Sequence, residues 1–228
     1  GVVNKYSVSE DKVEGYTPEY SGIVSGVITV TNKHTPEKTK RHVTKVWDDS
    51  NDQDGIRPGS VTVNLLADGK STGKSVTLNA ADNWTASFDD LDKYANGEEI
   101  VYTFTENAFS NSEKYKVAFT KDKDSDPTAW TVTNTHTPDL TEATVSKVWD
   151  DNNDNDKVRP GTVVMQLLAD NVAVEGKTVK LTSDDNWASK TITGLPKYSG
   201  GNQIVYSWQE TVPAGYRVTS YKEDATGT

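Results

Sequence analysis

The sequence contains no cysteine, a single methionine and no long hydrophobic run. Without cysteine, no disulfide can reinforce the fold, although thin β-modules generally need an additional constraint. No apolar stretch reaches the roughly 20 residues of a transmembrane helix, and the opening residues do not have the pattern of a signal peptide. We therefore expect no membrane insertion, and we interpret the chain as a mature segment of a longer protein.

Clustered positive charge is also missing. The chain has 34 acidic and 24 basic residues, and its formal net charge is −10. Nucleic acid is excluded as a partner, because phosphate binding requires clustered lysine and arginine. The histidines, His34, His42 and His136, are too scattered to form a metal site, and we expect His34 and His136 to pack in linkers. We predict no metal, no cofactor and no enzyme that acts on external substrates.

The residues that are abundant favour β-structure. Thr, Val, Tyr and Trp recur in alternation, whereas long runs of Leu, Ala, Glu and Lys are missing. For example, Val61, Val63 and Leu65 alternate with polar residues before the turn Ala67-Asp68-Gly69. Hydrophobic residues make up 33% of the chain, which suits small modules better than one thick core. The fold class predicted from these patterns is all-β.

A long internal repeat divides the chain. The stretch HVTKVWDDSNDQDGIRPG recurs as ATVSKVWDDNNDNDKVRPG, and Lys45 and Lys147 are 147 − 45 = 102 residues apart. Repeats of this length are tandem domains. We predict a complete domain at 39–138 (the complete repeat) and a domain lacking its last strand at 139–228 (the C-terminal repeat). Residues 1–38 (the N-terminal segment) resemble the second half of a domain, or a strand-donating segment.

Three chemically distinct residues are predicted to face the interior of the complete repeat. Lys45 alternates with Val43, Glu106 continues the alternation that includes Phe104, and Asn134 ends a strand. Burial disfavours the charged form of a lysine, and an uncharged amine is a nucleophile. A desolvated Glu106 would hold a proton and transfer it from the amine to the leaving group.

An amine and a carboxamide held together in this way can condense. Fixed geometry supplies the high effective concentration that such an unreactive pair requires. The predicted product is an isopeptide bond between Lys45 and Asn134, with release of ammonia. This reaction is internal and occurs once, so the protein would not be an enzyme in the ordinary sense. The alternatives are a Lys45 side chain that extends to water and a plain ion pair between Lys45 and Glu106.

Several separated motifs carry a family resemblance: KVWDD, RP, LLADG, DNW, YTFTE and TVTNTHTP. Together they resemble the Cna protein B-type domains, the immunoglobulin-like stalk modules of Gram-positive surface adhesins and pilins. The resemblance implies tandem β-sandwiches with spontaneous Lys–Asn isopeptide bonds. The matching positions are Glu106, Glu210 and Glu10 for the assisting acid, Lys45 and Lys147 for the amine, and Asn134 and Asn32 for the amide. Only the complete repeat has all three.

The resemblance also implies a function and a location. It indicates spacer repeats of a cell-wall-anchored adhesin on the bacterial surface, whose partners are neighbouring repeats, while other domains contact host extracellular matrix. One alternative is an adhesive module or pilin-like subunit that binds matrix itself, which would require an exposed aromatic or apolar patch. Another is head-to-tail strand complementation, in which Asn32 of one chain completes the Lys147 unit of the next.

The acidic loop WDDSNDQDG has two interpretations. Its spacing of Asp52 and Asp54 before Gly55 imitates the start of a calcium-binding loop. However, no glutamate closes the loop at the twelfth position, and the later copy has Lys157 where Gly55 would be needed. We therefore predict a solvated loop stabilised by Asx-turns.

Overall fold

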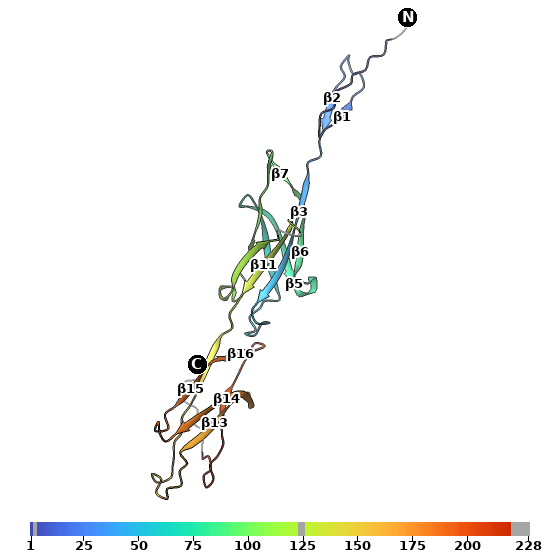
Figure 1. Cartoon of the computed structure of the whole chain (residues 1–228). Coiled ribbons are helices and arrows are strands. Elements are labelled where there is room, and N and C mark those ends of the chain that lie inside the picture. The colour runs from blue at the N-terminus through green and yellow to red at the C-terminus, as the bar shows by residue number, and fades with distance from the viewer. Residues whose placement is uncertain (2–3, 123–125, 220–228) are drawn as a thin grey trace. The chain divides into compact units, whose positions relative to one another are not determined.

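The structure, a computed structural model, consists of β-strands joined by loops and turns (Figure 1). The residues that it describes are 1, 4–122 and 126–219. Within them there is no α-helix. There are two short 3-10 helices, η1 (Ala80–Asp82) and η2 (Ser112–Lys114), and neither could cross a membrane. The predicted all-β class of tandem immunoglobulin-like sandwiches is confirmed.

The chain forms two compact units. Most described residues up to 133 belong to the first unit. The second unit contains residues 134–219 together with two segments from earlier in the chain, 47–58 and 110–116. The loop that follows the first long strand therefore belongs to the same unit as the linker after Asn134.

The N-terminal segment forms a small antiparallel hairpin. Its strands are β1 (Thr17–Tyr20) and β2 (Val30–Lys33), and Pro18 is paired with Asn32. Its larger apolar side chains are exposed: Tyr6, Val8, Val13, Tyr16, Tyr20, Ile23, Val24, Val27 and Val30. Within the described residues, this segment has a sheet but no buried core.

One sheet of the complete repeat brings its first and last strands together. In spatial order it consists of β10 (Lys116–Lys121), β11 (Ala129–Thr135), β3 (Lys38–Asp48) and β6 (Thr85–Asp92). The His42 amide donates to the Thr128 carbonyl, and the His136 amide donates to the Asp48 carbonyl. Since both residue numbers rise along these bonds, β3 and β11 run in the same direction.

A second sheet completes the sandwich of the complete repeat. It consists of β5 (Lys70–Asn79), β4 (Ser60–Ala67) and β9 (Tyr102–Glu106), with β4 in the centre. A short hairpin, β7 (Tyr94–Ala95) and β8 (Glu98–Glu99), precedes β9. Buried apolar side chains come from both sheets: Val43, Val63, Leu65, Leu78, Phe88, Phe104 and Val132. Alternation places them on the inner faces, because successive strand residues point to opposite sides.

The C-terminal repeat uses the same strand pattern. One sheet contains β14 (Val172–Thr182), β13 (Thr162–Ala169) and β18 (Tyr206–Glu210), and β12 (Leu140–Val145) pairs with β15 (Lys190–Pro196). The short strands β16 (Tyr198–Ser199) and β17 (Asn202–Gln203) form a hairpin. Its core contains Val145, Val163, Met165, Leu167, Leu181 and Leu195.

The first strands of the two repeats differ in length. β3 continues to Asp48, whereas β12 ends at Val145. The end of β3 has β11 as a hydrogen-bonded neighbour, while β12 pairs only with β15 in the described part of the chain. A strand needs backbone partners to be stable, so the equivalent stretch at 146–150 is irregular.

Candidate functional site

Lys45 lies on the inner face of β3. Arg41, Val43 and Lys45 are buried, and the residues between them are more accessible, as strand alternation requires. The Lys45 side chain has 0% exposure, and its Nζ donates to the Val46 carbonyl at 3.4 Å. This amine does not extend to water, so the interpretation of Lys45 as a solvated edge lysine is wrong.

Glu106 is held at the end of β9 and faces the same interior. It is paired in register with Val63 of β4, and its side chain is 6% exposed. The Lys45 Nζ lies 3.7 Å from the Glu106 Oε1. Water is excluded around both groups, which strengthens their electrostatic interaction and makes proton transfer between them feasible. The structure therefore brings the amine and the acid together.

Asn134 occupies the last inward position of β11. It follows the buried Val132 by two residues, and it is 1% exposed. Because β11 is the hydrogen-bonded neighbour of β3, the buried amide and the buried lysine lie on adjacent strands of one sheet. The first and last strands of the complete repeat thus carry the two groups that an isopeptide bond requires.

The second lysine–glutamate pair is also formed. The Lys147 Nζ lies 2.9 Å from Glu210 Oε1 and 3.1 Å from Oε2. Glu210 is paired with Met165, at the position corresponding to the Val63–Glu106 pair. The Lys147 amine also lies 4.5 Å from the ring centroid of Trp149. Its side chain is 16% exposed, and the position matching Asn134 lies beyond the end of the sequence.

The third set contains the acid and the amide. The Asn32 Nδ2 donates to Glu10 Oε1 at 2.9 Å, in an exposed part of the N-terminal hairpin. This contact shows that the glutamate and asparagine positions of a repeat unit are neighbours in this segment. Together with the lysine–glutamate pairs, each partial set brings its two predicted residues into contact.

The acidic loop contains an arrangement that the sequence reasoning missed. Asp49 is 1% exposed and accepts hydrogen bonds from Arg57 Nε at 3.0 Å and from the Tyr115 hydroxyl at 3.1 Å. Burial alone would raise the pKa of Asp49, but the hydrogen bonds from Arg57 and from the Asp52 amide hold it below its usual value. Asp54 is also buried, so the prediction of a solvated loop is wrong for these two residues.

The same arrangement recurs in the C-terminal repeat. Asp151 accepts hydrogen bonds from Arg159 Nε at 2.9 Å and from the Tyr216 hydroxyl at 3.1 Å. Asp49 and Arg57, like Asp151 and Arg159, are eight residues apart. The DD…RP spacing, which recurs in both repeats, was the sequence signal that could have revealed this arrangement. In both copies the arginine guanidinium is hydrogen-bonded to the carboxylate that a calcium ion would need as a ligand.

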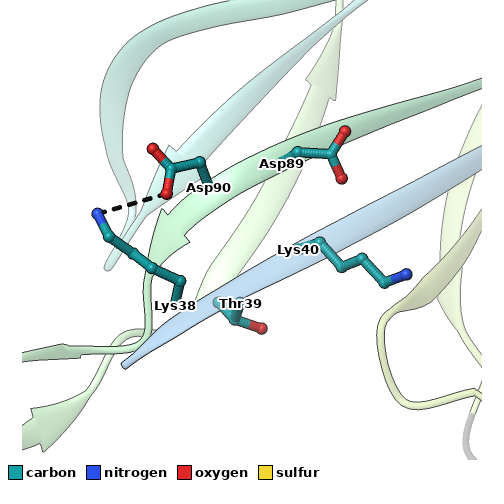
Figure 2. A pocket seen from close by; sticks show the side chains of 5 residues that line it. All are labelled: Lys38, Thr39, Lys40, Asp89 and Asp90. Carbon is teal, nitrogen blue, oxygen red and sulfur yellow. Dashed lines mark ion pairs between the residues drawn. The ribbon is translucent and has the colours of Figure 1, made fainter. Parts of the chain in front are cut away.

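A surface hollow on β3 and β6 is not a candidate binding site. It is lined by Lys38, Thr39, Lys40, Asp89 and Asp90. Figure 2 shows Lys38 facing Asp90 and Lys40 pointing away. The Lys38 Nζ lies 3.8 Å from the Asp90 Oδ1. Lys38 also pairs with Asp92 at 2.7 Å. The charged side chains that line the hollow are exposed, and Lys38 is paired with carboxylates, so the hollow offers no buried charged group that could orient a ligand.

The fold and the buried pairs define a class of protein: tandem immunoglobulin-like β-sandwich repeats with a lysine–glutamate pair inside each sandwich. Within this class, the family model of the Cna protein B-type domain matches residues 41–135 and 143–228. The chain belongs to this family.

Two comparisons show which members of this family the chain is similar to. It is 40% identical over 224 residues to a collagen adhesin of Staphylococcus aureus, a match that covers 98% of this chain and 17% of the adhesin. It is similar to the crystal structure of two B repeat units (B1B2) of the collagen-binding protein of S. aureus, with 39% identity and a TM-score of 0.66. That match covers 88% of this chain and 50% of the other. The chain thus spans under a fifth of the adhesin's length.

Proposed function

We propose that the chain is a structural spacer within a cell-wall-anchored bacterial surface adhesin, located outside the cell. Its membership of the B-type domain family and its 40% identity to a collagen adhesin support this function. We assign the complete repeat to residues 39–138, with parts of two further domains at 1–38 and 139–228. Its immediate partners are the neighbouring repeats of the same protein.

The proposed stabilising reaction joins Lys45 to Asn134. The uncharged Lys45 Nζ attacks the Asn134 Cγ, and the protonated Glu106 carboxyl polarises the amide carbonyl. The Nζ–Cγ bond forms, the Cγ–Nδ2 bond breaks, and Glu106 transfers a proton from the amine to the departing nitrogen. One ammonia leaves, so atoms and charges balance without a cofactor. The complete repeat reacts once, and no external substrate is turned over.

The observation that carries this proposal is the fully buried Lys45 amine, 3.7 Å from the buried Glu106 carboxylate. Burying a lysine is costly unless it serves a purpose or is well paired. Lys147 and Glu210 supply the same amine and acid in the C-terminal repeat, and Glu10 and Asn32 supply the acid and amide in the N-terminal segment. In the proposal, Glu210 and Glu10 have the proton-transfer role of Glu106.

Intact mass spectrometry of the 228-residue chain tests the reaction directly. We expect the wild type to be lighter than its sequence mass by one ammonia. The Glu106→Ala and Lys45→Ala variants should have their full sequence mass. Glu98→Ala is the matched control, because Glu98 is an exposed glutamate on β8, and it should retain the ammonia loss. A wild type of full mass would refute the cross-link.

A second candidate function, direct matrix binding, is favoured by one observation. Tyr6, Tyr16 and Tyr20 of the N-terminal segment are 74%, 47% and 43% exposed, and several valines lie near them in sequence. Exposed aromatic patches are typical of interaction sites. Under the spacer proposal, the isolated chain should not bind immobilised collagen. Saturable binding that is lost in a Tyr6→Ser/Tyr20→Ser variant would instead support the adhesive function.

A further inference from the structure

The strand β10 lies at an open edge of its sheet. In the described part of the chain it has one hydrogen-bonded neighbour, β11. The Asp122 amide, directly after the strand, donates to the Ala129 carbonyl of β11 at 2.9 Å. The backbone groups of successive strand residues point to alternate sides, so the even-numbered residues of β10 face β11. The N–H and C=O groups of Val117, Phe119 and Lys121 therefore point to the open side.

Other outer strands of this chain carry features that prevent the addition of another strand. In β1, Pro18 has no N–H, and it lies on the open side because the Ser21 amide bonds inward to the Thr29 carbonyl. In β5 and β14, the left-handed glycines Gly73 and Gly176 stand where the pairing shifts register. Prolines and bulges of this kind protect sheet edges from association. β10 contains neither proline nor glycine.

The comparison with β1 shows which residue of β10 makes the difference. Each strand begins directly after a tyrosine that packs on a histidine ring, Tyr16 for β1 and Tyr115 for β10. Pro18 and Val117 each lie two residues beyond this tyrosine, so they occupy equivalent positions. Val117 is 47% exposed. The complete repeat thus presents an ordinary backbone N–H where the equivalent strand has none.

The residues at this edge are complementary to a second copy of the same strand. In an antiparallel pair, residues whose backbone groups point outward must face one another. The register with the largest overlap places Phe119 opposite itself and Val117 opposite Lys121. In this register Lys116 is opposite Asp122, and two-fold symmetry forms this pair twice. Opposite charges facing each other across strands are favourable, and no like charges face each other here.

We propose that β10 is an interaction site for β10 of a second copy, so that two complete repeats join edge to edge as an antiparallel pair. Backbone hydrogen bonds would continue the sheet of one copy into the sheet of the other. A six-residue strand makes a small interface, and each copy has a net charge of −10. We therefore expect a weak dimer, with a Kd on the order of 0.1 mM.

The antiparallel geometry determines which chains could meet. The two paired repeats point in opposite directions, because their β10 strands do. If the chain is a spacer on the cell surface, as proposed above, the contact would join chains that project from facing surfaces. This consequence rests on the proposed function, whereas the pairing itself does not. Self-association of the purified chain therefore tests the pairing separately from the spacer role and from the cross-link.

Sedimentation of the full chain at concentrations from about 10 µM to about 1 mM tests the interaction. We expect the average mass to rise from 25.0 kDa toward twice this value. Val117→Pro removes one outward N–H and leaves the bonds to β11 intact, so it should raise the Kd at least about tenfold. Val117→Thr keeps the N–H and should associate like the wild type. A monomeric wild type at the highest concentration, or unchanged association of Val117→Pro, would overturn the proposal.

Disulfide trapping tests the register and needs no proline. The chain has no cysteine, and the exposed residues Ala118 and Thr120 face each other in the proposed pair. Their Cα atoms would lie about 4.5 Å apart, within reach of a disulfide. Identical positions would lie diagonally, about 7–8 Å apart. An oxidised mixture of Ala118→Cys and Thr120→Cys chains should therefore form mixed dimers about tenfold faster than either variant alone forms its own dimer. Equal rates would contradict the antiparallel register and overturn the proposal.

Discussion

The buried lysine is the residue whose environment departs most from its usual preference. A charged amine removed from water costs several kcal/mol unless an opposite charge and hydrogen bonds compensate. Lys45 has Glu106 at 3.7 Å and the Val46 carbonyl at 3.4 Å. These contacts explain how it is tolerated as an ion pair, while the proposed reaction would remove both the charge and its cost.

Stability measurements can distinguish an ion pair from a covalent bond at this site. Lys45→Met leaves a buried Glu106 without its lysine and prevents the bond, so we expect a loss of about 3–5 kcal/mol in the free energy of unfolding by urea. In a Lys45→Met/Glu106→Gln double variant, the buried charge is also removed. If the pair were only ionic, the double variant would regain wild-type stability; with a bond, it should remain clearly less stable.

The stability of the protein in acid also depends on a single residue, Asp151. The hydrogen bond from Arg159 lowers the pKa of Asp151 to about 2 from its ordinary value of 3.8, although burial opposes this shift. Because the folded-state pKa is lowered, the stabilisation is complete above about pH 4 and is lost as the pH falls through about 2.

The corresponding measurement is a series of thermal melts across this range. The wild-type melting temperature should fall more steeply between about pH 4 and about pH 2 than that of Asp151→Asn. Asp184→Asn, which changes an exposed aspartate of the same repeat, should keep the wild-type slope. Parallel curves for wild type and Asp151→Asn would contradict the assignment.

Among the elements, both acidic loops contain three successive residues in the left-handed backbone conformation. Ser50, Asn51 and Asp52 have φ values of 53°, 59° and 60°, and Asn152, Asn153 and Asp154 repeat this left-handed turn at 51°, 59° and 59°. Asn and Asp tolerate this conformation better than most residues. The turn is held because the carboxylate at its start accepts the amide of Asp52 or Asp154, at 3.0 Å in each copy.

Replacing Arg57 by lysine should test how strongly this loop is anchored. A lysine cannot make the two-pronged contact with Asp49 or stack on Trp47 as the guanidinium does, 5.6 Å from the ring centroid. We expect Arg57→Lys to lower the free energy of unfolding by about 1–3 kcal/mol. Arg159→Lys is the matched variant, and its effect should be smaller because Asp151 is 11% exposed, against 1% for Asp49. An equal or larger effect at Arg159 would contradict this ranking.

For the whole molecule, the position of the proposed bond determines the response to tension. Lys45 and Asn134 are 134 − 45 = 89 residues apart, near the two ends of the complete repeat. A covalent bond between them would let force bypass the residues between them. It would also restrict the unfolded chain by about 4–5 kcal/mol, if the loop entropy measured for disulfides applies.

Single-molecule stretching should reveal this bypass. In the wild type, the complete repeat should not release the chain between Lys45 and Asn134. In Glu106→Ala, unfolding should add about 300 Å of extended chain, at about 3.4 Å for each of the 89 residues. Glu98→Ala should behave like the wild type, and the same extension in the wild type would exclude a bond.

Much of the fold could be predicted because its signals are local or repeated. Alternation along β3 and β9 placed Lys45 and Glu106 inside, and the 102-residue offset identified the tandem repeats. The roles of Asp49 and Asp54 could not be predicted in this way. A run of acidic residues in a loop is usually solvated. These two are held inside by Arg57 from the same loop and by Tyr115 and His136, which are distant in the sequence.

The sequence by itself determined the all-β class, the tandem arrangement and the inward direction of the lysine, because strand alternation and repetition depend only on the order of residues. The tertiary structure alone decided which polar groups meet across the interior. It paired Lys45 with Glu106, bound the Asp49 carboxylate to Arg57 and placed His136 between two acceptors. Lys45 and Glu106, like His136 and its acceptors, come from distant strands and loops, whereas Asp49 and Arg57 lie in one loop. The strength of all these contacts depends on burial, which no local pattern specifies.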